Sequence, residues 1–349
     1  MSRALLFTKS RNMKNKKFLF LMILITLTTG LFSFTCIAQP KEEEEAYKTD
    51  STSRDAYEEI TKKKTNFNVI ASITQGYDTN ATLDSEREGD FFNQANLDLD
   101  LIHEFYSNVK VKFAAGATDI NYYDVTDANF LDAYAGSGLI FDFLDVLSME
   151  TLYKFSEIYY HKDKQGTYLT HEAIFGLKHA ITDSLYHKVE YEIMYKHFDE
   201  RQARDAAGTQ VKDRKDLRHT VSYQITKTFT KTLFKVKGTF FHNDSNDKYL
   251  DYYDYNSYKA SGSLIQLLTE KLYIIGSVAY EFKDFKDRYV SDIGKKQEDD
   301  VYFISAALFY DLTANLSVGA DYTYIKNDSN DPLEDYTDNL FTTGLYYTF

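Results

Sequence analysis

Residues 185–198 read LYHKVEYEIMYKHF, and the order of side chains in this stretch decides between helix and strand. Apolar and aromatic side chains face one way: Leu185, Val189, Tyr191, Ile193 and Tyr195. Charged side chains lie between them: Lys188, Glu190, Glu192 and Lys196. A period of two puts the two sets on opposite faces of a β-strand, whereas a helix would mix them. The stretch therefore predicts a strand with one apolar and one charged face.

The same period of two recurs from residue 66 to the end of the chain. Counting such segments predicts about fourteen strands. They lie near 66–77, 91–105, 109–122, 129–142, 147–160, 168–181, 185–198, 216–227, 232–242, 255–267, 272–283, 301–311, 315–326 and 337–349.

The connections between these strands alternate in length. Short ones lie at 106–108, 143–146, 182–184, 226–230, 268–271 and 312–315, and longer polar ones at 78–90, 123–128, 161–167, 199–215, 243–254, 284–300 and 327–336. Regular alternation along an even number of strands is typical of a transmembrane antiparallel up-and-down β-barrel with short periplasmic turns and longer extracellular loops. A soluble secreted β-protein, which also buries one face of each strand, is the alternative fold.

The first part of the chain predicts export. Six basic residues and no acidic ones precede an apolar run at 18–34, which is typical of a signal peptide cleaved after Ala38. Cys36 is the one cysteine of the chain, so the mature protein is expected to contain no disulfide. Residues 39–64 are highly charged and are expected to form a periplasmic tail ahead of a barrel at 65–349.

The composition fits an exported barrel and argues against nucleic-acid binding. The chain of 349 residues contains 30 Tyr and 26 Phe but only 2 Pro, which favours strands. Its net charge of −13 would repel nucleic acid. The chain ends in GLYYTF, and Phe349 closing an amphipathic strand is similar to the C-terminal assembly signal of bacterial outer-membrane proteins. We therefore expect outer-membrane lipid and the barrel assembly machinery as partners in a Gram-negative bacterium.

The sequence NDSND occurs twice, at 243–247 and at 327–331, each time in a long connection. Asn and Asp readily leave a strand, because they accept left-handed backbone angles and bond their own main chain. Alternatively, the oxygens of these residues could bind calcium, although the glycine and distal glutamate of an EF-hand loop are missing. The calcium candidates would be Asp244, Asn246, Asp247, Asp328, Asn330 and Asp331.

Three short stretches carry a resemblance to a known family: TQGYDTNAT at 74–82, YIKNDSNDPLEDYTDN at 324–339 and the terminal GLYYTF. Together they resemble the β-barrel porins of the outer-membrane "porin 2" type, which are associated with exopolysaccharide secretion. The barrel half of the surface lipoprotein assembly modifiers is also similar, but those proteins carry a helical repeat domain for which residues 39–64 have no room. The resemblance implies a barrel that exports polysaccharide.

The inner wall of the expected barrel would hold the functional residues. Assigned by the period of two, its charged side chains are Asp98, Asp100, Lys110, Lys112, Asp132, Glu150, Lys154, Glu172, Lys178, Lys188, Glu190, Glu192, Lys196, Arg218, Lys235, Lys237, Lys259, Glu281, Lys283 and Asp321. The two signs are nearly balanced, so these residues could form a salt-bridged wall or a transverse field across a pore. The loops 284–300 and 199–215 are the ones expected to plug it.

Three functions remain open from the sequence. The first is a channel for small polar solutes or an exported polysaccharide, and the second is a non-conducting structural or assembly protein that binds an envelope partner. The third, an outer-membrane hydrolase, lacks a G-x-S-x-G elbow. We expect no catalytic residue and no cofactor.

Overall fold

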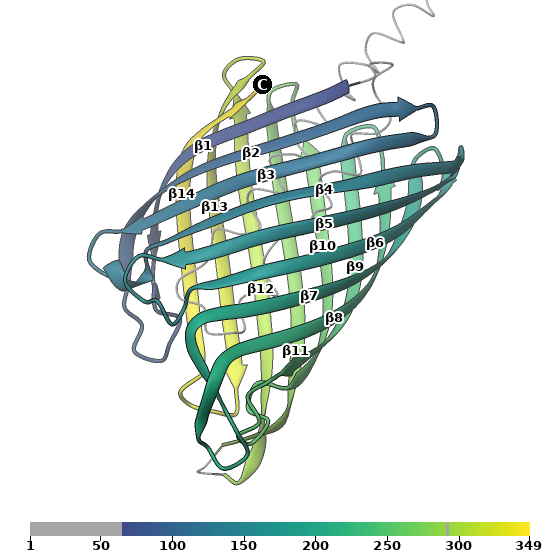
Figure 1. The fold of residues 1–349 in the computed structure, drawn as a ribbon. Coiled ribbons are helices and arrows are strands. Elements are labelled where there is room, and N and C mark those ends of the chain that lie inside the picture. Colours follow the sequence, from purple (N-terminus) through teal and green to yellow (C-terminus); the bar gives the residue numbers. More distant parts are fainter. Residues whose placement is uncertain (1–64, 291–292) are drawn as a thin grey trace, which may run out of the picture.

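Fourteen antiparallel strands form one closed barrel in this protein, a computed structural model of which describes residues 65–290 and 293–349 (Figure 1). The expected signal peptide at 1–38 and tail at 39–64 lie outside the described residues. The strands are β1 (Thr65–Asp78), β2 (Asp90–Tyr106), β3 (Val109–Tyr122), β4 (Phe130–Leu144), β5 (Leu147–Tyr160), β6 (Tyr168–Thr182), β7 (Leu185–Arg204), β8 (Gln210–Thr228), β9 (Thr232–Ser245), β10 (Tyr255–Leu267), β11 (Leu272–Val290), β12 (Lys295–Asp311), β13 (Leu316–Ser329) and β14 (Tyr336–Thr348).

The first and last strands pair with each other and close the barrel. Their register runs antiparallel from Ile70 opposite Thr348 to Asp78 opposite Leu340. Beyond it, Val69 and Phe349 exchange backbone hydrogen bonds of 3.0 and 2.9 Å. Closure gives every strand two neighbours and leaves no open edge, which is the condition for a sheet to cross a membrane.

Alternate residues of each strand face the inside and the outside of the barrel. On β2, the residues from Asp90 to Leu97 alternate between buried and exposed without interruption. On β12, the same alternation runs from Val301 to Asp311. This confirms the predicted all-β barrel, and β3, β5 and β10 begin and end at the predicted residues.

Two pairs of strands extend beyond the predicted ends. The segment 199–215 was expected to be a loop, but β7 runs to Arg204 and β8 starts at Gln210. Likewise β11 runs to Val290 and β12 starts at Lys295, so most of 284–300 is also strand. Both segments are therefore projecting hairpins rather than long loops that fold into the barrel. The sequence did not predict these strand ends, because charged residues replace the alternating apolar ones there. The hairpins project beyond the hydrocarbon layer, so they need no apolar outer face.

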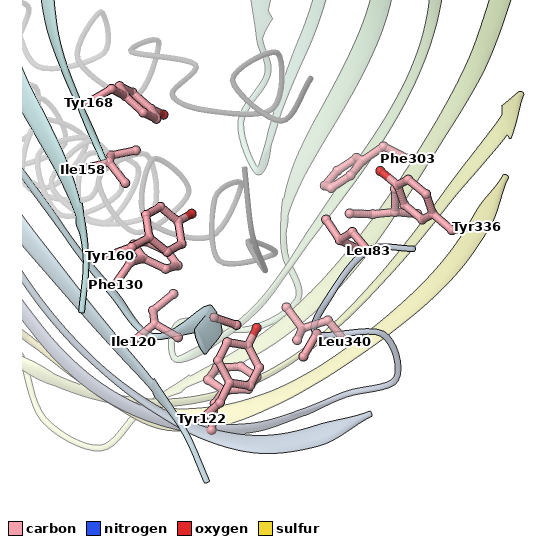
Figure 2. Close-up of a cluster of buried hydrophobic side chains, with 14 of the residues drawn as sticks. Leu83, Ile120, Tyr122, Phe130, Ile158, Tyr160, Tyr168, Phe303, Tyr336 and Leu340 are labelled. Carbon is pink, nitrogen blue, oxygen red and sulfur yellow. The ribbon is translucent and has the colours of Figure 1, made fainter. Parts of the chain in front are cut away.

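A cluster of buried apolar side chains lies on the inner face, near the end of the barrel that carries the long loops. Tyr122, Phe130 and Tyr160 come from one part of the wall, and Tyr336 and Leu340 come from another (Figure 2). Cross-strand ring pairs recur in this cluster with centroids 5.4 Å apart: Phe92 with Tyr122, Phe130 with Tyr160, and Tyr168 with Phe198.

Consecutive tyrosines near the strand ends lie on opposite faces of the barrel wall. Tyr122 and Tyr160 are buried on the inner face, whereas their neighbours Tyr123 and Tyr159 are exposed on the outside. Adjacent positions in a strand must face opposite ways, so a pair of consecutive tyrosines supplies only one to each side.

Among the described residues, no helix is long and apolar enough to cross a membrane. The helical element in this part of the chain is a single 3-10 turn, η3 (Thr126–Ala128).

The two faces of β7 should respond differently to substitution. Val189 is exposed on the outside, and Glu190 beside it bonds to Lys188 on the inside. Replacing Val189 by Arg puts a charge against lipid, and we expect it to cost about 2–4 kcal/mol of folding free energy. Replacing Glu190 by Gln should cost much less. Urea unfolding in lipid vesicles measures both, and equal losses would contradict the assignment of the faces.

Candidate functional site

The inner wall of the barrel is the candidate functional site, because the alternation of burial places a large set of charged side chains there. On β7, for example, Lys188 and Lys196 are buried, whereas Val189 and Tyr191 are exposed on the other face. All of the charged residues that the sequence assigned to the inside lie on the face of their strand that carries the buried positions.

A ladder of alternating charges joins four strands along this wall, in the half of the barrel next to the short turns. Glu150 of β5 bonds to Lys112 of β3 and lies 3.2 Å from the Nζ atom of Lys188 on β7. The same Nζ atom lies 2.9 Å from Glu190, whose other oxygen lies 3.8 Å from Lys237 on β9. Such pairing offsets part of the cost of removing charges from water.

Two further ion pairs extend the network on the same side of the barrel. Lys154 lies 2.8 Å from Glu172, and Lys110 lies 3.1 Å from Asp142. The salt-bridged wall that the sequence left open is therefore present on β3 to β9.

Other charged side chains on the inner face contact rings or polar groups. Arg218 stacks on Phe241 at 4.5 Å and donates to the Tyr255 hydroxyl at 2.9 Å. Asp98 accepts hydrogen bonds from Tyr134 and Asn96. The rest of the predicted set is buried or half-buried on this face: Asp100, Asp132, Lys178, Glu192, Lys196, Lys235, Lys259, Glu281, Lys283 and Asp321.

Charge is unevenly distributed around the inner wall. Among the described residues, β13, β14, β1 and β2 carry no inward Lys or Arg, although they carry inward carboxyl groups at Asp321, Asp338, Asp78, Asp90, Asp98, Asp100 and Glu104. On β9 and β10, the charged residues on the inner face of the described chain are all basic: Lys235, Lys237 and Lys259. Because β9 stands opposite β2 in the ring of strands, the two signs face each other across the barrel.

The first NDSND copy continues the sheet beyond the end of β9. The backbone N–H of Asn246 donates to the carbonyl of Lys215 at 2.9 Å, and the Asn246 side-chain oxygen accepts the N–H of Lys215 at 2.8 Å. The Asn246 amide also donates to the carbonyl of Asp213 at 3.0 Å. A side chain thus takes the place of a backbone carbonyl and holds the extended part of β8.

The second copy repeats this arrangement at the end of β13. The backbone N–H of Asn330 donates to the carbonyl of Glu298 at 3.2 Å, and its side-chain oxygen accepts the N–H of Glu298 at 3.2 Å. Its amide donates to the carbonyl of Lys296 at 2.8 Å. We call this arrangement the asparagine clasp. In the first clasp Asn246 bonds to β8, and in the second Asn330 bonds to β12.

The other residues of the motif shape the turn itself. Ser245 accepts the N–H of Asp247, which accepts the N–H of Tyr249 in turn. Ser329 and Asp331 form the same two bonds in the second copy. The motif is therefore a hydrogen-bonded strand ending, as one of the two interpretations of the sequence held.

The calcium interpretation finds no geometric support in these contacts. The two carboxylate oxygens of Asp247 contact the N–H of Tyr249 and the side chain of Arg204, and the oxygen of Asn246 contacts Lys215. No group of three or more His, Cys, Asp and Glu side chains that could hold a metal ion occurs in the part of the chain that the structure describes.

Comparison with known proteins finds a family model that matches part of this sequence. Residues 253–349 match the family described as "Putative beta-barrel porin 2", as the porin 2 resemblance implied. No curated protein matches the sequence.

Several solved structures have a similar overall shape. A loop-deletion mutant of OmpT, an outer membrane protein of Vibrio cholerae, shares 10% identity and a TM-score of 0.46, with 82% of this chain and 100% of that chain covered. An anion-selective porin from Comamonas acidovorans shares 8% identity and a TM-score of 0.44, with 82% of this chain and 99% of that chain covered. A bacterial polysaccharide outer membrane secretin shares 9% identity and a TM-score of 0.42, with 80% of this chain and 97% of that chain covered.

The asparagine clasp predicts a local effect on hydrogen exchange. Replacing Asn246 by Ala removes the acceptor of the Lys215 N–H, and we expect that amide to exchange roughly fivefold faster, which corresponds to a hydrogen bond of about 1 kcal/mol. The Glu298 amide in the second clasp is the internal control and should not change. Asp244→Ala, at an exposed neighbour, should leave both amides unchanged. An unchanged Lys215 amide in Asn246→Ala would contradict the clasp.

Proposed function

We propose, from the match of residues 253–349 to the "Putative beta-barrel porin 2" family and from the charged inner wall, that this outer-membrane β-barrel is a non-enzymatic channel for polar solutes. The inner wall is the observation that carries the proposal. Its ladder from Lys112 to Lys237 runs along the inner wall from β3 to β9, whereas the outer face of the same strands is apolar. A polar interior inside an apolar exterior is the arrangement of water-filled barrels.

The number of strands supports a channel of intermediate width. Barrels of about 8 strands are filled by their own side chains, whereas those of 16–18 strands leave an aqueous channel. A barrel of fourteen strands lies between these limits. Small polar solutes are the expected cargo, and a single exported polysaccharide chain is the largest candidate. If soluble polysaccharide added to one side of a conducting bilayer leaves the current unchanged, the polysaccharide part of the proposal falls.

A non-conducting structural barrel is the second candidate function. The buried apolar cluster on the inner face, which includes Phe130 and Tyr160, supports it because apolar side chains on an inner wall disfavour water there. Planar-bilayer recording separates the two candidates. A purified, heat-modifiable barrel that never conducts would leave the structural function, with an envelope protein as the partner to be found by pull-down.

We further propose that Phe349 is read by the barrel assembly machinery. Its backbone pairs with Val69 at the closing seam, and its side chain is 69% exposed on the outside. Phe349→Ala should lower the fraction of assembled barrel in cells while refolding in detergent remains normal. Normal assembly in cells would rule this role out.

The basic residues of β9 predict ion preference. Lys235 and Lys237 both lie on the inner face, and their charges raise the local potential in a confined space. Replacing both by Gln should shift the reversal potential in a salt gradient toward cations, most strongly at low salt where screening is weakest.

The matched control for this pair is Lys326→Gln, which removes a charge from the outer face of β13. This variant should keep the wild-type reversal potential. A β9 double variant with unchanged ion preference would contradict the assignment of these lysines to a conducting pore.

A further inference from the structure

The loop between β9 and β10, residues 246–254, is turned toward the inside of the barrel. The ring of Tyr253 lies 3.5 Å from the guanidinium of Arg214 on β8, and the ring of Tyr252 lies 4.2 Å from that of Arg288 on β11. Arg214 and Arg288 are both buried among the inward positions of their strands. Two consecutive tyrosines of the loop therefore contact the inner faces of two different strands.

These contacts stretch the loop across a wide part of the wall. β8 and β11 are separated by β9 and β10, so three strand spacings of about 4.8 Å, or about 14 Å, lie between them. The loop connects β9 to β10, and its tyrosines reach the next strand on either side, β8 and β11. It covers this width on the inner side, at the end of the barrel that carries the long loops.

Charged residues fasten the remainder of the loop. On one side, Arg204 of β7 lies 3.1 Å from Asp247 and stacks on Tyr249 at 4.8 Å. On the other side, Lys286 of β11 lies 2.9 Å from Asp251. The two projecting hairpins, β7–β8 and β11–β12, thus act as anchors for the loop that lies between them.

Asp254 anchors the end of the loop next to β10. Its carboxylate accepts the backbone N–H of Ser245 at 2.7 Å, and Lys286 and Lys248 lie 3.6 and 3.7 Å away. Burial raises the pKa of Asp254, and the hydrogen bond from Ser245 and the charge of Lys248 oppose this rise. The charged carboxylate therefore depends on these neighbours, and the loop end is fixed only while they stay in place.

The two cation–ring contacts of Tyr252 and Tyr253 are modest in strength, because each joins one cation to one ring. The two tyrosine contacts use side chains and leave the strand ladder untouched. The loop can consequently detach from Arg214 and Arg288 without unfolding the barrel.

We propose that residues 246–254 form a strap that narrows the mouth of the barrel on the side of the long loops, and that release of Tyr252 and Tyr253 widens it. The strap rests on the proposed channel function and adds a regulated constriction to it. The loops that the sequence favoured as plugs, 199–215 and 284–300, hold the strap instead of filling the barrel.

The experiment compares single-channel conductance in wild type and in the double variant Tyr252→Leu, Tyr253→Leu. Leucine keeps an apolar side chain but cannot bind a cation through a ring, so the part of the strap that holds residues 252 and 253 should detach from Arg214 and Arg288. We expect conductance to rise roughly 1.5-fold or more, because a wider mouth carries more current. Tyr258→Leu, at an exposed outer position of β10, is the matched control and should behave as wild type. Heat-modifiable migration in gels checks that each variant is folded.

A second readout does not depend on conductance. Ser261 lies on the inner face of β10, and a cysteine placed there can be labelled by a charged maleimide added outside. Labelling should be severalfold faster when Tyr252 and Tyr253 are replaced.

The two readouts separate the strap from the channel. Faster labelling with no current from any variant supports the strap and overturns the channel. Current from the wild type with unchanged conductance and labelling in the double variant overturns the strap and leaves the channel. If no variant carries current and labelling is unchanged in the double variant, both proposals are overturned.

Discussion

Closure of the sheet is the constraint on which the rest of the structure depends. In hydrocarbon, each unsatisfied backbone N–H or carbonyl costs several kcal/mol, so a membrane-spanning sheet can have no open edge. The pairing of Val69 with Phe349 completes the ring, and both ends of the described chain therefore lie on the side of the short turns. Once the ring is closed, each strand must present one face to lipid and the other to the interior.

This division of faces explains the charge pattern of the wall. Residues such as Lys188 and Glu150 stand in an interior where an isolated charge would be costly, and the ladder supplies each with an opposite charge. Around the ring of strands the charge is also uneven, acidic on β13 to β2 and basic on β9 and β10. Such an arrangement matters for solutes that pass between the two sides, as a channel requires.

The sequence predicted the barrel because a period of two is a local signal that each strand repeats. The ends of β3, β5 and β10 were predicted to the residue, because the period of two stops at those positions. The asparagine clasps were not predicted, because the pairing of Asn246 with Lys215 joins residues far apart in the chain. The strap was missed for the same reason: Arg214 and Arg288 come together with Tyr253 and Tyr252 only in three dimensions. The inward ring pairs escaped notice because an aromatic residue near a strand end suits either face.

The most direct test of the central claim is a spin-label scan along β7. Single cysteines from residue 186 to 196 are suited to it, because the one natural cysteine, Cys36, lies in the expected signal peptide. The account predicts collisions with oxygen, which dissolves in lipid, to peak at the odd positions such as Val189 and Tyr191. Collisions with a water-soluble nickel complex should peak at the even positions such as Lys188 and Glu190. Accessibility that does not alternate, or that repeats every three to four residues, would contradict a membrane-spanning barrel wall.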